Sequence, residues 1–319
     1  MVFIVVADAV SKPELYESRF SKLGEVKVYR GQPSSIEEYL CRVDGADIAV
    51  VSHFKLPARA FDTSNLKLVA LTRTGFDDVD LDAATLKGVT VTNVPGYSNE
   101  AVAEHVFAML LSFVRRIPEA DFWMREEKFD CTAFEGRELR GKTLGVIGTG
   151  QIGSRVAEIA RCFGMDVIAY DVRRSPASGS KFRYVGLDRL CAESDFITLH
   201  LPLTPDTEGL LDDEAFRLMK PGAVIVNTAR GPVIRQDALV RALDEGRIGG
   251  ACLDVYDREP LPQDSPLIGL SNTLLTPHIA YNTREAKEQS IAIAAENVAQ
   301  FLAGKPRNVV NPAVLGVKQ

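Results

Sequence analysis

The segment from Thr143 to Asp171 constrains the fold of this 319-residue chain more than any other. It begins with a short apolar run, residues 144–147, which is typical of a buried parallel strand. Three glycines with the spacing G-x-G-x-x-G follow at once, and an amphipathic stretch comes next. A second apolar run, residues 167–170, ends on Asp171. The order strand, glycines, helix, strand predicts a βαβ unit of a parallel sheet.

Each of the three glycines has a physical role in this interpretation. Gly148 permits a tight turn, Gly150 lets the backbone approach a pyrophosphate, and Gly153 lets the helix pack closely against the strand. The start of the helix offers free N–H groups to phosphates. Asp171 follows Gly153 at about the 20-residue spacing expected of a carboxylate that binds an adenosine ribose. The segment therefore predicts a dinucleotide site, and a structural βαβ unit without a nucleotide is the alternative.

The composition excludes several classes of partner. The net charge is −6 and no run of Lys or Arg occurs, which argues against nucleic acid and lipid surfaces. No apolar run approaches membrane-spanning length, and residues 2–7 lack the basic lead-in of a signal peptide. The cysteines have no C-x-x-C pair, which suits small core residues in a reducing cytosol; they are Cys41, Cys131, Cys162, Cys191 and Cys252. We expect a cytoplasmic protein without a metal site.

Apolar runs alternate with helical stretches along the whole chain. Strands are predicted at residues 3–7, 26–29, 48–51, 66–71, 89–92, 144–147, 167–170, 182–185, 196–199, 223–226, 250–253 and 274–276. Helices are predicted at residues 14–23, 99–116, 213–219, 236–245 and 284–302. This alternation predicts an α/β protein with two doubly wound parallel-sheet domains. The last helix could return the chain to the first domain.

The helix predicted at residues 99–116 has almost no polar face. A helix that is apolar all round is buried, so we expect it to pack against another domain or another subunit. His105 lies inside this run, and we interpret it as a core or interface histidine.

Polar side chains follow three apolar strands of the second half. Arg230, Glu259 and His278 come from separate strand-end loops, which should converge at one edge of the sheet. This set suits hydride transfer at a 2-hydroxy or 2-oxo acid, because a guanidinium binds a carboxylate and an imidazole moves the proton. A carboxylate beside the imidazole favours its protonated form, which ketone reduction needs. A structural ion pair of Arg230 and Glu259 is the alternative.

With these loops, the sequence closely resembles the D-isomer-specific 2-hydroxyacid dehydrogenases over essentially the whole chain. The matching segments are residues 74–80, 93–98, 101–105, the glycine fingerprint, 200–205, 227–231, 259–260 and 276–278. The resemblance implies a Rossmann NAD-binding domain at residues 100–282, inserted in a flavodoxin-like substrate domain made of residues 1–99 and 283–319. It also implies a homodimer formed largely through the nucleotide domains, which would explain the apolar helix.

The resemblance also implies roles for individual residues. Arg230 would bind and polarise the substrate, His278 would be the acid/base, and Glu259 would support His278. The backbone at Thr74 and Gly75 would receive the substrate carboxylate, and Arg230 and His278 would also bind the substrate. The implied cofactor-binding residues are Gly148, Gly150, Gln151, Ile152, Gly153, Asp171, His200, Pro202, Thr207, Thr228, Ala229, Arg230, Asp254 and His278. His53 has no firm counterpart in the family, and we interpret it as a possible substrate-loop residue.

The cofactor is expected to be NAD, because the charge of Asp171 would repel the 2′-phosphate of NADP. Arg173 and Arg174 lie close by in sequence and could accept that phosphate, so NADP is the less favoured alternative. Residues 95–98 and 278–281 resemble the D-lactate dehydrogenases, whereas residues 74–77 and the short separation of Glu259 from His278 resemble glyoxylate or hydroxypyruvate reductases. The chain ends at Gln319, which speaks against phosphoglycerate enzymes with regulatory tails. An NAD-sensing, corepressor-like binding protein on the same scaffold is the alternative to an enzyme.

Overall fold

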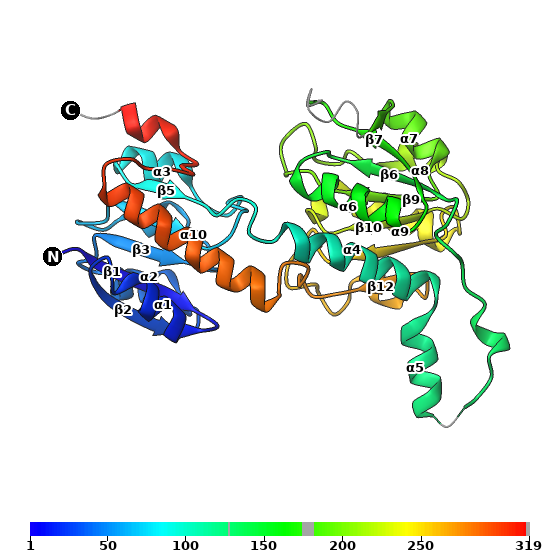
Figure 1. Cartoon of the computed structure of the whole chain (residues 1–319), viewed down its shortest axis with the longest axis horizontal. Coiled ribbons are helices and arrows are strands. Elements are labelled where there is room, and N and C mark those ends of the chain that lie inside the picture. Colours follow the sequence, from blue (N-terminus) through cyan, green and yellow to red (C-terminus); the bar gives the residue numbers. More distant parts are fainter. Residues whose placement is uncertain (127, 174–181, 317–319) are drawn as a thin grey trace. The chain divides into compact units, whose positions relative to one another are not determined.

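The computed structural model describes residues 1–126, 128–173 and 182–316 of the chain and divides into two compact units (Figure 1). The first unit comprises Met1–Ser98 and Thr283–Gln319, and the second comprises Asn99–Asn282. The backbone therefore passes between the units twice. Each unit contains one parallel β-sheet with helices on both faces.

The first sheet has the strand order β2-β1-β3-β4-β5, and all its pairings are parallel. Its strands are β1 (Phe3–Ala9), β2 (Glu25–Arg30), β3 (Ile48–Val51), β4 (Leu68–Leu71) and β5 (Thr90–Thr92). The order 2-1-3-4-5 is that of the flavodoxin-like fold. In open α/β sheets of this kind, ligands bind beyond the carboxyl ends of the strands, where the loops after β3, β4 and β5 lie here.

Successive residues of β1 point to opposite faces and enter two separate cores. Ile4 and Val6 pack with α1 (Pro13–Phe20) and α10 (Arg284–Leu302), whereas Val5 and Ala7 face the other side. That other side is covered by α2 (Ile36–Val43), η1 (Ala58–Phe61) and α3 (Leu81–Leu86). Helix α10 therefore completes the core of the N-terminal sheet, although it comes from the far end of the chain.

The second sheet has the order β12-β11-β10-β9-β6-β7-β8 and is also parallel throughout. Its strands are β6 (Thr143–Ile147), β7 (Asp166–Tyr170), β8 (Arg183–Tyr184), β9 (Phe196–Leu199), β10 (Val224–Asn227), β11 (Gly250–Leu253) and β12 (Thr273–Leu275). The chain order reverses between β6 and β9, which is the topological switch point of the Rossmann fold. The predicted fold class, two doubly wound parallel-sheet domains, is confirmed.

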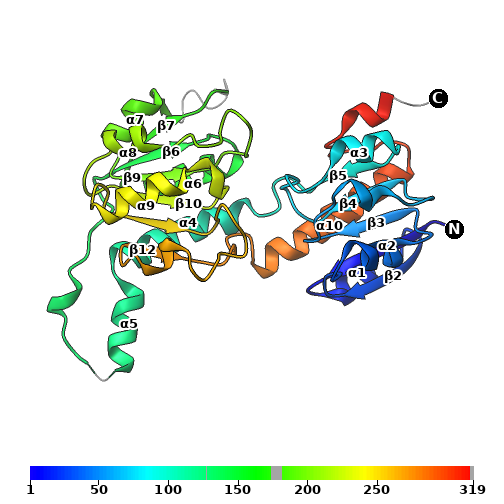
Figure 2. The same ribbon diagram turned by 180° about the vertical axis from the view of Figure 1, so that it is seen from behind.

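Helices cover both faces of the second sheet (Figures 1 and 2). One face is covered by α4 (Asn99–Val114) and α6 (Gln151–Cys162), and the other by α7 (Leu187–Glu193), α8 (Asp213–Leu218) and α9 (Gln236–Asp244). Eight of the 16 residues of α4 are buried, and they pack with sheet residues such as Val226 and Cys252. Its own sheet therefore covers the apolar side of α4, and packing of α4 against another subunit stays a prediction.

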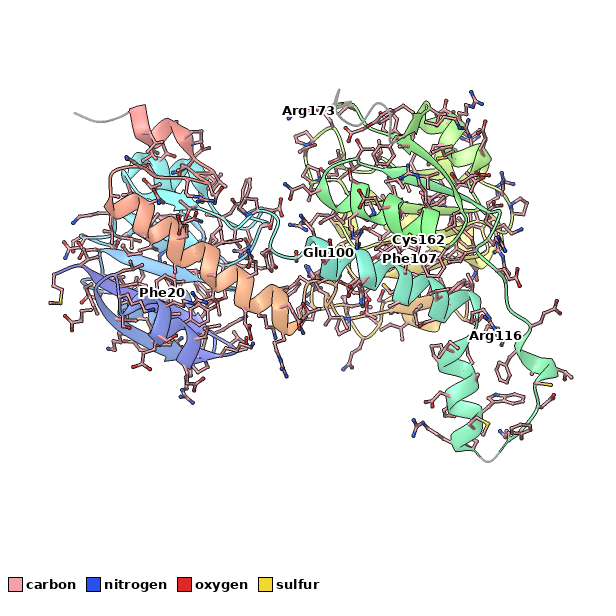
Figure 3. The ribbon with its side chains drawn as sticks, in the orientation of Figure 1. Phe20, Glu100, Phe107, Arg116, Cys162 and Arg173 are labelled. Atoms are coloured by element: carbon pink, nitrogen blue, oxygen red, sulfur yellow. The ribbon has the colours of Figure 1, made fainter. Side chains whose placement is uncertain are left out.

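The sequence interpretation missed α5 (Ile117–Arg125), which has no buried residue and extends away from the sheet of its unit (Figures 1 and 3). Arg116, in a left-handed conformation, starts this helix. The returning chain contacts α5 through aromatic rings, because Trp123 meets Phe134 edge-on at 5.1 Å. The exposed apolar side chains of this arm, which spans residues 117–126 and 128–134, are Ile117, Phe122, Met124 and Phe129.

Other expectations concerned cysteines and membranes. Cys191 and Cys252 are buried, as expected of small core residues, but Cys41, Cys131 and Cys162 are exposed, so that interpretation is wrong for these three. Among the helices that the structure describes, none is long and apolar enough to cross a bilayer.

The remaining short helices are η2 (Thr132–Phe134), η4 (Gly231–Val233), η5 (Pro266–Gly269) and η6 (Pro312–Gly316).

Candidate active site

The glycine loop between β6 and α6 requires glycine at its first and third positions. Gly148 has a φ of +93°, and a Cβ atom there would lie 2.5 Å from the carbonyl oxygen of His200. A Cβ at Gly153 would overlap the carbonyl oxygen of Gly148. Gly150 differs, because no atom lies within 4 Å of the position of its Cβ. The loop therefore packs tightly on the protein side and is open beside Gly150, as a pyrophosphate site requires.

Helix α6 begins at Gln151 with Gly150 at its N-cap, and no side chain caps it. Its first N–H groups thus lack a side-chain acceptor, which suits a bound phosphate. Asp171 ends β7 beside this loop and accepts hydrogen bonds from the N–H of Thr149 at 2.7 Å and from the N–H of Arg173 at 2.8 Å. Burial acts to raise the pKa of Asp171, but these donors hold it below its usual value. Arg174 lies outside the described residues.

The loop after β9 carries three of the predicted cofactor residues. The hydroxyl of Thr207 donates to the carbonyl of Pro202 at 2.7 Å, so it closes this loop on itself. A ring nitrogen of His200 lies 3.0 Å from Oγ1 of Thr198. Burial lowers the pKa of His200 to about 3, so this imidazole is neutral at physiological pH. A neutral ring fits a position that lines a cofactor cleft and does not exchange protons.

Arg230 lies in a loop that is fixed by the buried amide of Asn227, at the end of β10. Oδ1 of Asn227 accepts from the N–H of Ala229 at 3.0 Å, and Nδ2 donates to the carbonyl of Arg230 at 2.9 Å. Nη1 of Arg230 donates to the carbonyl of Ala229 at 2.7 Å. The hydroxyl of Thr228 is buried without a hydrogen-bond partner in the described parts of the chain. Because such groups are normally satisfied, this hydroxyl fits a contact with bound cofactor.

The Arg230 loop and the Glu259 loop touch through their backbones. A Cβ at Gly231 would overlap the carbonyl group of Tyr256 and lie 2.5 Å from the N–H nitrogen of Asp257. The N–H of Tyr256 in turn donates to Oε1 of Glu259 at 3.1 Å. The absence of a side chain at Gly231 is thus what lets the two loops meet.

His278 and Glu259 form a close pair. Nδ1 of His278 lies 2.7 Å from Oε2 of Glu259, and both side chains are partly exposed, by 42% and 37%. Burial acts to raise the pKa of Glu259, but the bond to His278, the N–H of Tyr256 and the charge of Arg230 hold it below its usual value. Glu259 is therefore a carboxylate at neutral pH, paired with an imidazole that solvent can reach.

Asp254, at the end of β11, holds the loop that carries His278. Its side chain is fully buried and accepts the hydroxyl of Thr276 at 2.6 Å and the N–H groups of Ile279 and Ala280, each at 2.8 Å. Burial acts to raise the pKa of Asp254, but these donors and His105 lower it. Nε2 of His105, on α4, lies 3.3 Å from Oγ1 of Thr276. His105 is thus partly buried under this loop, and the sequence did not indicate that contact.

A family model for the NAD-binding domain of D-isomer-specific 2-hydroxyacid dehydrogenases matches residues 107–280, which include the glycine loop and all three loops just described. The chain belongs to this family. It is an NAD-dependent oxidoreductase that acts on 2-hydroxy acids.

Several relatives of this dehydrogenase are similar along nearly their whole length. The hydroxypyruvate reductase of Blautia hydrogenotrophica is 38% identical over 91% of this chain and 92% of its own. D-lactate dehydrogenase from Aquifex aeolicus, solved with NAD and lactic acid, has a TM-score of 0.83 and 34% identity, and the match covers 98% of this chain and 99% of that one. An acyclic imino acid reductase, solved with NADPH and D-Arg, has a TM-score of 0.88 and 36% identity, covering 97% and 100%.

Two predicted substrate residues of the dehydrogenase, Thr74 and Gly75, follow β4 in the first unit, whereas Arg230, Glu259 and His278 belong to the second. Thr74 is exposed and Gly75 is half-buried. His53 follows β3 in the first unit; it is exposed, and its N–H donates to the buried carboxylate of Asp8 at 2.7 Å. The substrate-side loops of the first unit thus present backbone and an imidazole at the carboxyl edge of the sheet.

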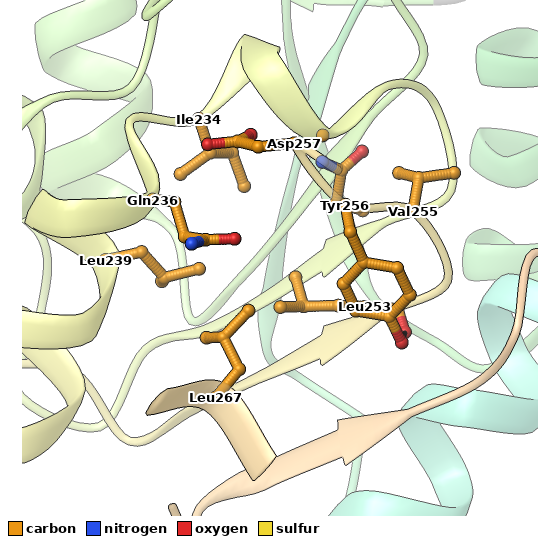
Figure 4. A pocket seen from close by; sticks show the side chains of 10 residues that line it. Ile234, Gln236, Leu239, Leu253, Val255, Tyr256, Asp257 and Leu267 are labelled. Carbon is orange, nitrogen blue, oxygen red and sulfur yellow. Dashed lines mark hydrogen bonds between the residues drawn. The ribbon is translucent and has the colours of Figure 1, made fainter. Parts of the chain in front are cut away.

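A pocket of the second unit lies next to the Arg230 loop (Figure 4). It lies among the loops after β10 and β11 and helix α9, and it is lined by Asn227, Gly231, Ile234, Gln236, Leu239, Leu253, Val255, Tyr256, Asp257 and Leu267. Burial, with the charges of Asp237 and Glu208, raises the pKa of Asp257. In the described ranges no cluster of three or more His, Cys, Asp or Glu side chains could bind a metal ion.

Proposed function

We propose that the dehydrogenase interconverts small 2-oxo acids and D-2-hydroxy acids, with glyoxylate, hydroxypyruvate or pyruvate as the 2-oxo acid. Arg230 binds the substrate carboxylate and polarises the neighbouring oxygen, and His278 with Glu259 exchanges the proton. The bound nicotinamide supplies the hydride. The observation that carries this proposal is the 2.7 Å pair of His278 and Glu259, together with the contact of the Glu259 loop with the Arg230 loop.

The pair with Glu259 indicates which ring nitrogen of His278 would exchange a proton with the substrate. Nδ1 of His278 faces Glu259, so Nε2 is the nitrogen available to the substrate oxygen. In the reducing direction Nε2 donates its proton to the oxygen of the former carbonyl, and Glu259 stabilises the imidazolium that precedes this step. In the oxidising direction Nε2 takes the hydroxyl proton.

A panel assay tests the proposal. Glyoxylate, hydroxypyruvate, pyruvate and longer 2-oxo acids are each supplied with NADH or NADPH, and one arm adds an amine to test imine reduction. We expect turnover of at least one of the three short 2-oxo acids without amine. If NADH binds but no acid is reduced, the chain is better described as an NAD-sensing, corepressor-like protein.

Substitution of His278 tests its role in proton transfer. His278→Ala should lower kcat by about a hundredfold or more, since it removes proton transfer, while the Kd for NADH stays nearly unchanged. A kcat close to that of the wild type would show that another group moves the proton.

We also propose a preference for NADH over NADPH. The support is the ionised carboxylate of Asp171, whose charge would repel a 2′-phosphate. We expect kcat/KM with NADH to exceed that with NADPH by about tenfold or more. A higher kcat/KM with NADPH would show that Arg173 or a neighbour accepts the 2′-phosphate. NADPH is included in the test because the similar imino acid reductase was solved with NADPH.

Finally, we propose that two copies of the chain form a cytoplasmic homodimer through the second unit. The support is the arm around α5, whose exposed apolar side chains include Phe122 and Met124. Light scattering should give twice the mass of the chain, and the double substitution Phe122→Ser with Met124→Ser should shift it toward one chain. A monomeric wild type would exclude the dimer.

A further inference from the structure

In the loop after β4, two consecutive peptide groups have carbonyl oxygens that accept hydrogen bonds from side chains of the first unit. Thr74 and Phe76 are exposed and Gly75 is half-buried. The two residues that bond their carbonyls are Asn93, which is buried, and Arg73, which is half-buried. The two peptide groups concerned join Thr74 to Gly75 and Gly75 to Phe76. Their orientation matters, because the family resemblance implies that the backbone of this loop receives the substrate carboxylate.

The first peptide is held by Asn93. Nδ2 of Asn93 donates to the carbonyl of Thr74 at 2.8 Å, and the Asn93 side chain is almost fully buried at the end of β5. The hydroxyl of Thr74 adds a second bond, to the carbonyl of Val94 at 2.9 Å. The carbonyl of Thr74 is thus fixed toward β5.

Asn93 is itself held by a network of buried amides that reaches α10. The N–H of Asn93 donates to the carbonyl of Asn308 at 3.1 Å, and its carbonyl accepts from Nδ2 of Asn297 at 2.8 Å. Nδ2 of Asn308 donates to Oδ1 of Asn297 at 2.8 Å. Since Asn297 is fully buried in α10, Asn93 has one defined orientation.

The second peptide is held by Arg73. Nη1 of Arg73 donates to the carbonyl of Gly75 at 3.1 Å and to Oδ1 of Asp78 at 2.6 Å. Asp78 therefore holds the Arg73 guanidinium in the position from which it bonds the carbonyl of Gly75. Nε and Nη2 of Arg73 are buried and, in the part of the chain that is described, make no hydrogen bond, so this cation is not bound there by any other acceptor.

Geometry then determines where the N–H groups point. In a trans peptide the N–H is directed opposite to the C=O, so fixing the carbonyls of Thr74 and Gly75 turns the N–H groups of Gly75 and Phe76 away from Asn93 and Arg73. Among the described residues, neither N–H donates to a protein acceptor. Two adjacent N–H groups that meet no acceptor in the described residues suit one carboxylate.

We propose that Asn93 and Arg73 are positioning residues that orient the N–H groups of Gly75 and Phe76 to bind the substrate carboxylate. This inference rests on the proposed function and adds the residues that set the affinity of the carboxylate site. Neither side chain needs to touch the substrate. Their loss should therefore weaken substrate binding and leave cofactor binding and the proton transfer largely intact.

Two pairs of variants separate positioning from general stabilisation. Asn93→Ala is compared with Asn311→Ala, because Asn311 is also buried and holds β5 through bonds to Val91 and Val89 without reaching the loop. Arg73→Gln is compared with Arg42→Gln, since Arg42 likewise bonds a carboxylate, that of Glu38, and backbone carbonyls, those of Ala7 and Gly31. All four should lower Tm.

We expect only Asn93→Ala and Arg73→Gln to raise the KM for the 2-oxo acid, by about tenfold or more, with the KM for NADH within about twofold of the wild type. The Kd for oxamate, a carboxylate that is not reduced, should rise in parallel in the presence of NADH. Arg73→Lys should recover most of the affinity, because its ammonium can still donate to the carbonyl of Gly75.

The outcomes separate this inference from the proposed function. If the wild type reduces 2-oxo acids but both variants keep a wild-type KM and oxamate Kd, or if the two control variants lose affinity equally, the positioning role is wrong and the function stands. If one variant fails to fold, the other still decides. If the wild type reduces no 2-oxo acid, the proposed function and this inference both fall.

Discussion

The backbone N–H of His278 donates to the carbonyl of Asp254 at 2.9 Å, and His278 has a φ of +52°. This left-handed conformation is unfavourable for a residue with a side chain, by roughly 1–2 kcal/mol. The carboxylate of Asp254 compensates, because it binds Thr276 before the histidine and the two N–H groups after it. One buried acid thus fixes the conformation from which the imidazole reaches Glu259.

We expect Asp254→Asn to lower kcat by about tenfold or more and the free energy of unfolding by about 1–3 kcal/mol, because an amide cannot accept all three bonds. The pKa of Asp254 is lower in the folded chain than its ordinary value near 4, so its stabilisation is complete above that pH and is lost as the pH falls. The difference in Tm between variant and wild type should therefore be full at pH 7 and shrink below about pH 4.

Asp195→Asn provides the matched control for this substitution. Asp195 also has a lowered pKa and accepts the N–H of Thr143 at 2.8 Å, but it lies just before β9, away from the strand ends that carry the catalytic loops. It should lower Tm without lowering kcat. Equal losses of kcat in both variants would mean that Asp254 acts only through stability.

Glu259→Gln should lower kcat for reduction and for oxidation by about tenfold or more. Oε2 of Glu259 lies 2.7 Å from Nδ1 of His278, and an amide cannot stabilise the positive charge that the imidazole carries during proton transfer. The Kd for NADH should change little. Steady-state rates in both directions would measure this, and unchanged rates would exclude a role for the pair in proton transfer.

Arg230→Lys should raise the KM for the 2-oxo acid and lower kcat, each by about tenfold or more, because an ammonium has no planar fork for a carboxylate. The Kd for NADH should change little. Arg235→Lys, an exposed arginine of the same unit, serves as the control. Near-normal kinetics for Arg230→Lys would favour the structural ion pair with Glu259 over substrate binding.

Gly231→Ala should separate the two loops that Gly231 lets meet. Its methyl group would overlap the backbone of Tyr256, so we expect a loss of about 1–3 kcal/mol in unfolding free energy and a large drop in kcat. Gly269→Ala is the control, because no atom lies within 4 Å of its Cβ position. Thermal unfolding and steady-state assays of both variants decide this, and a Gly231→Ala enzyme with normal Tm and kcat would contradict the contact.

Much of the fold could be predicted because strands at the centre of a parallel sheet are apolar along their whole length. Strands β3, β9 and β11 begin and end where the predicted apolar runs do. The short helices α2, α3 and α7 were missed, because six to eight residues show a helical period only weakly, although α1 and α8, which are as short, were predicted. A local signal existed for α2: Ser35 accepts the N–H of Glu38, which is the start of a capping box.

Arg230, Glu259 and His278 could be proposed as site residues because each lies in a loop that follows an apolar strand. The groups that hold them could not, because their bonds join residues far apart in the chain. Asn93 bonds Asn297, and Asp254 lies close to His105, in each case across more than a hundred residues with no shared periodicity. A polar residue at the end of a buried strand, as at Asn93 and Asn227, is the signal that would have identified some of them.

The packing of α10 against the N-terminal sheet has a consequence for synthesis of the chain. Ile291, Ala294 and Val298 fill that core, so the N-terminal sheet lacks this partner until the ribosome has translated α10. The second unit is continuous, from Asn99 to Asn282, and should fold earlier. Limited proteolysis of ribosome-stalled chains should find that unit protected while the N-terminal segment is still cut; the reverse order would contradict this sequence of events.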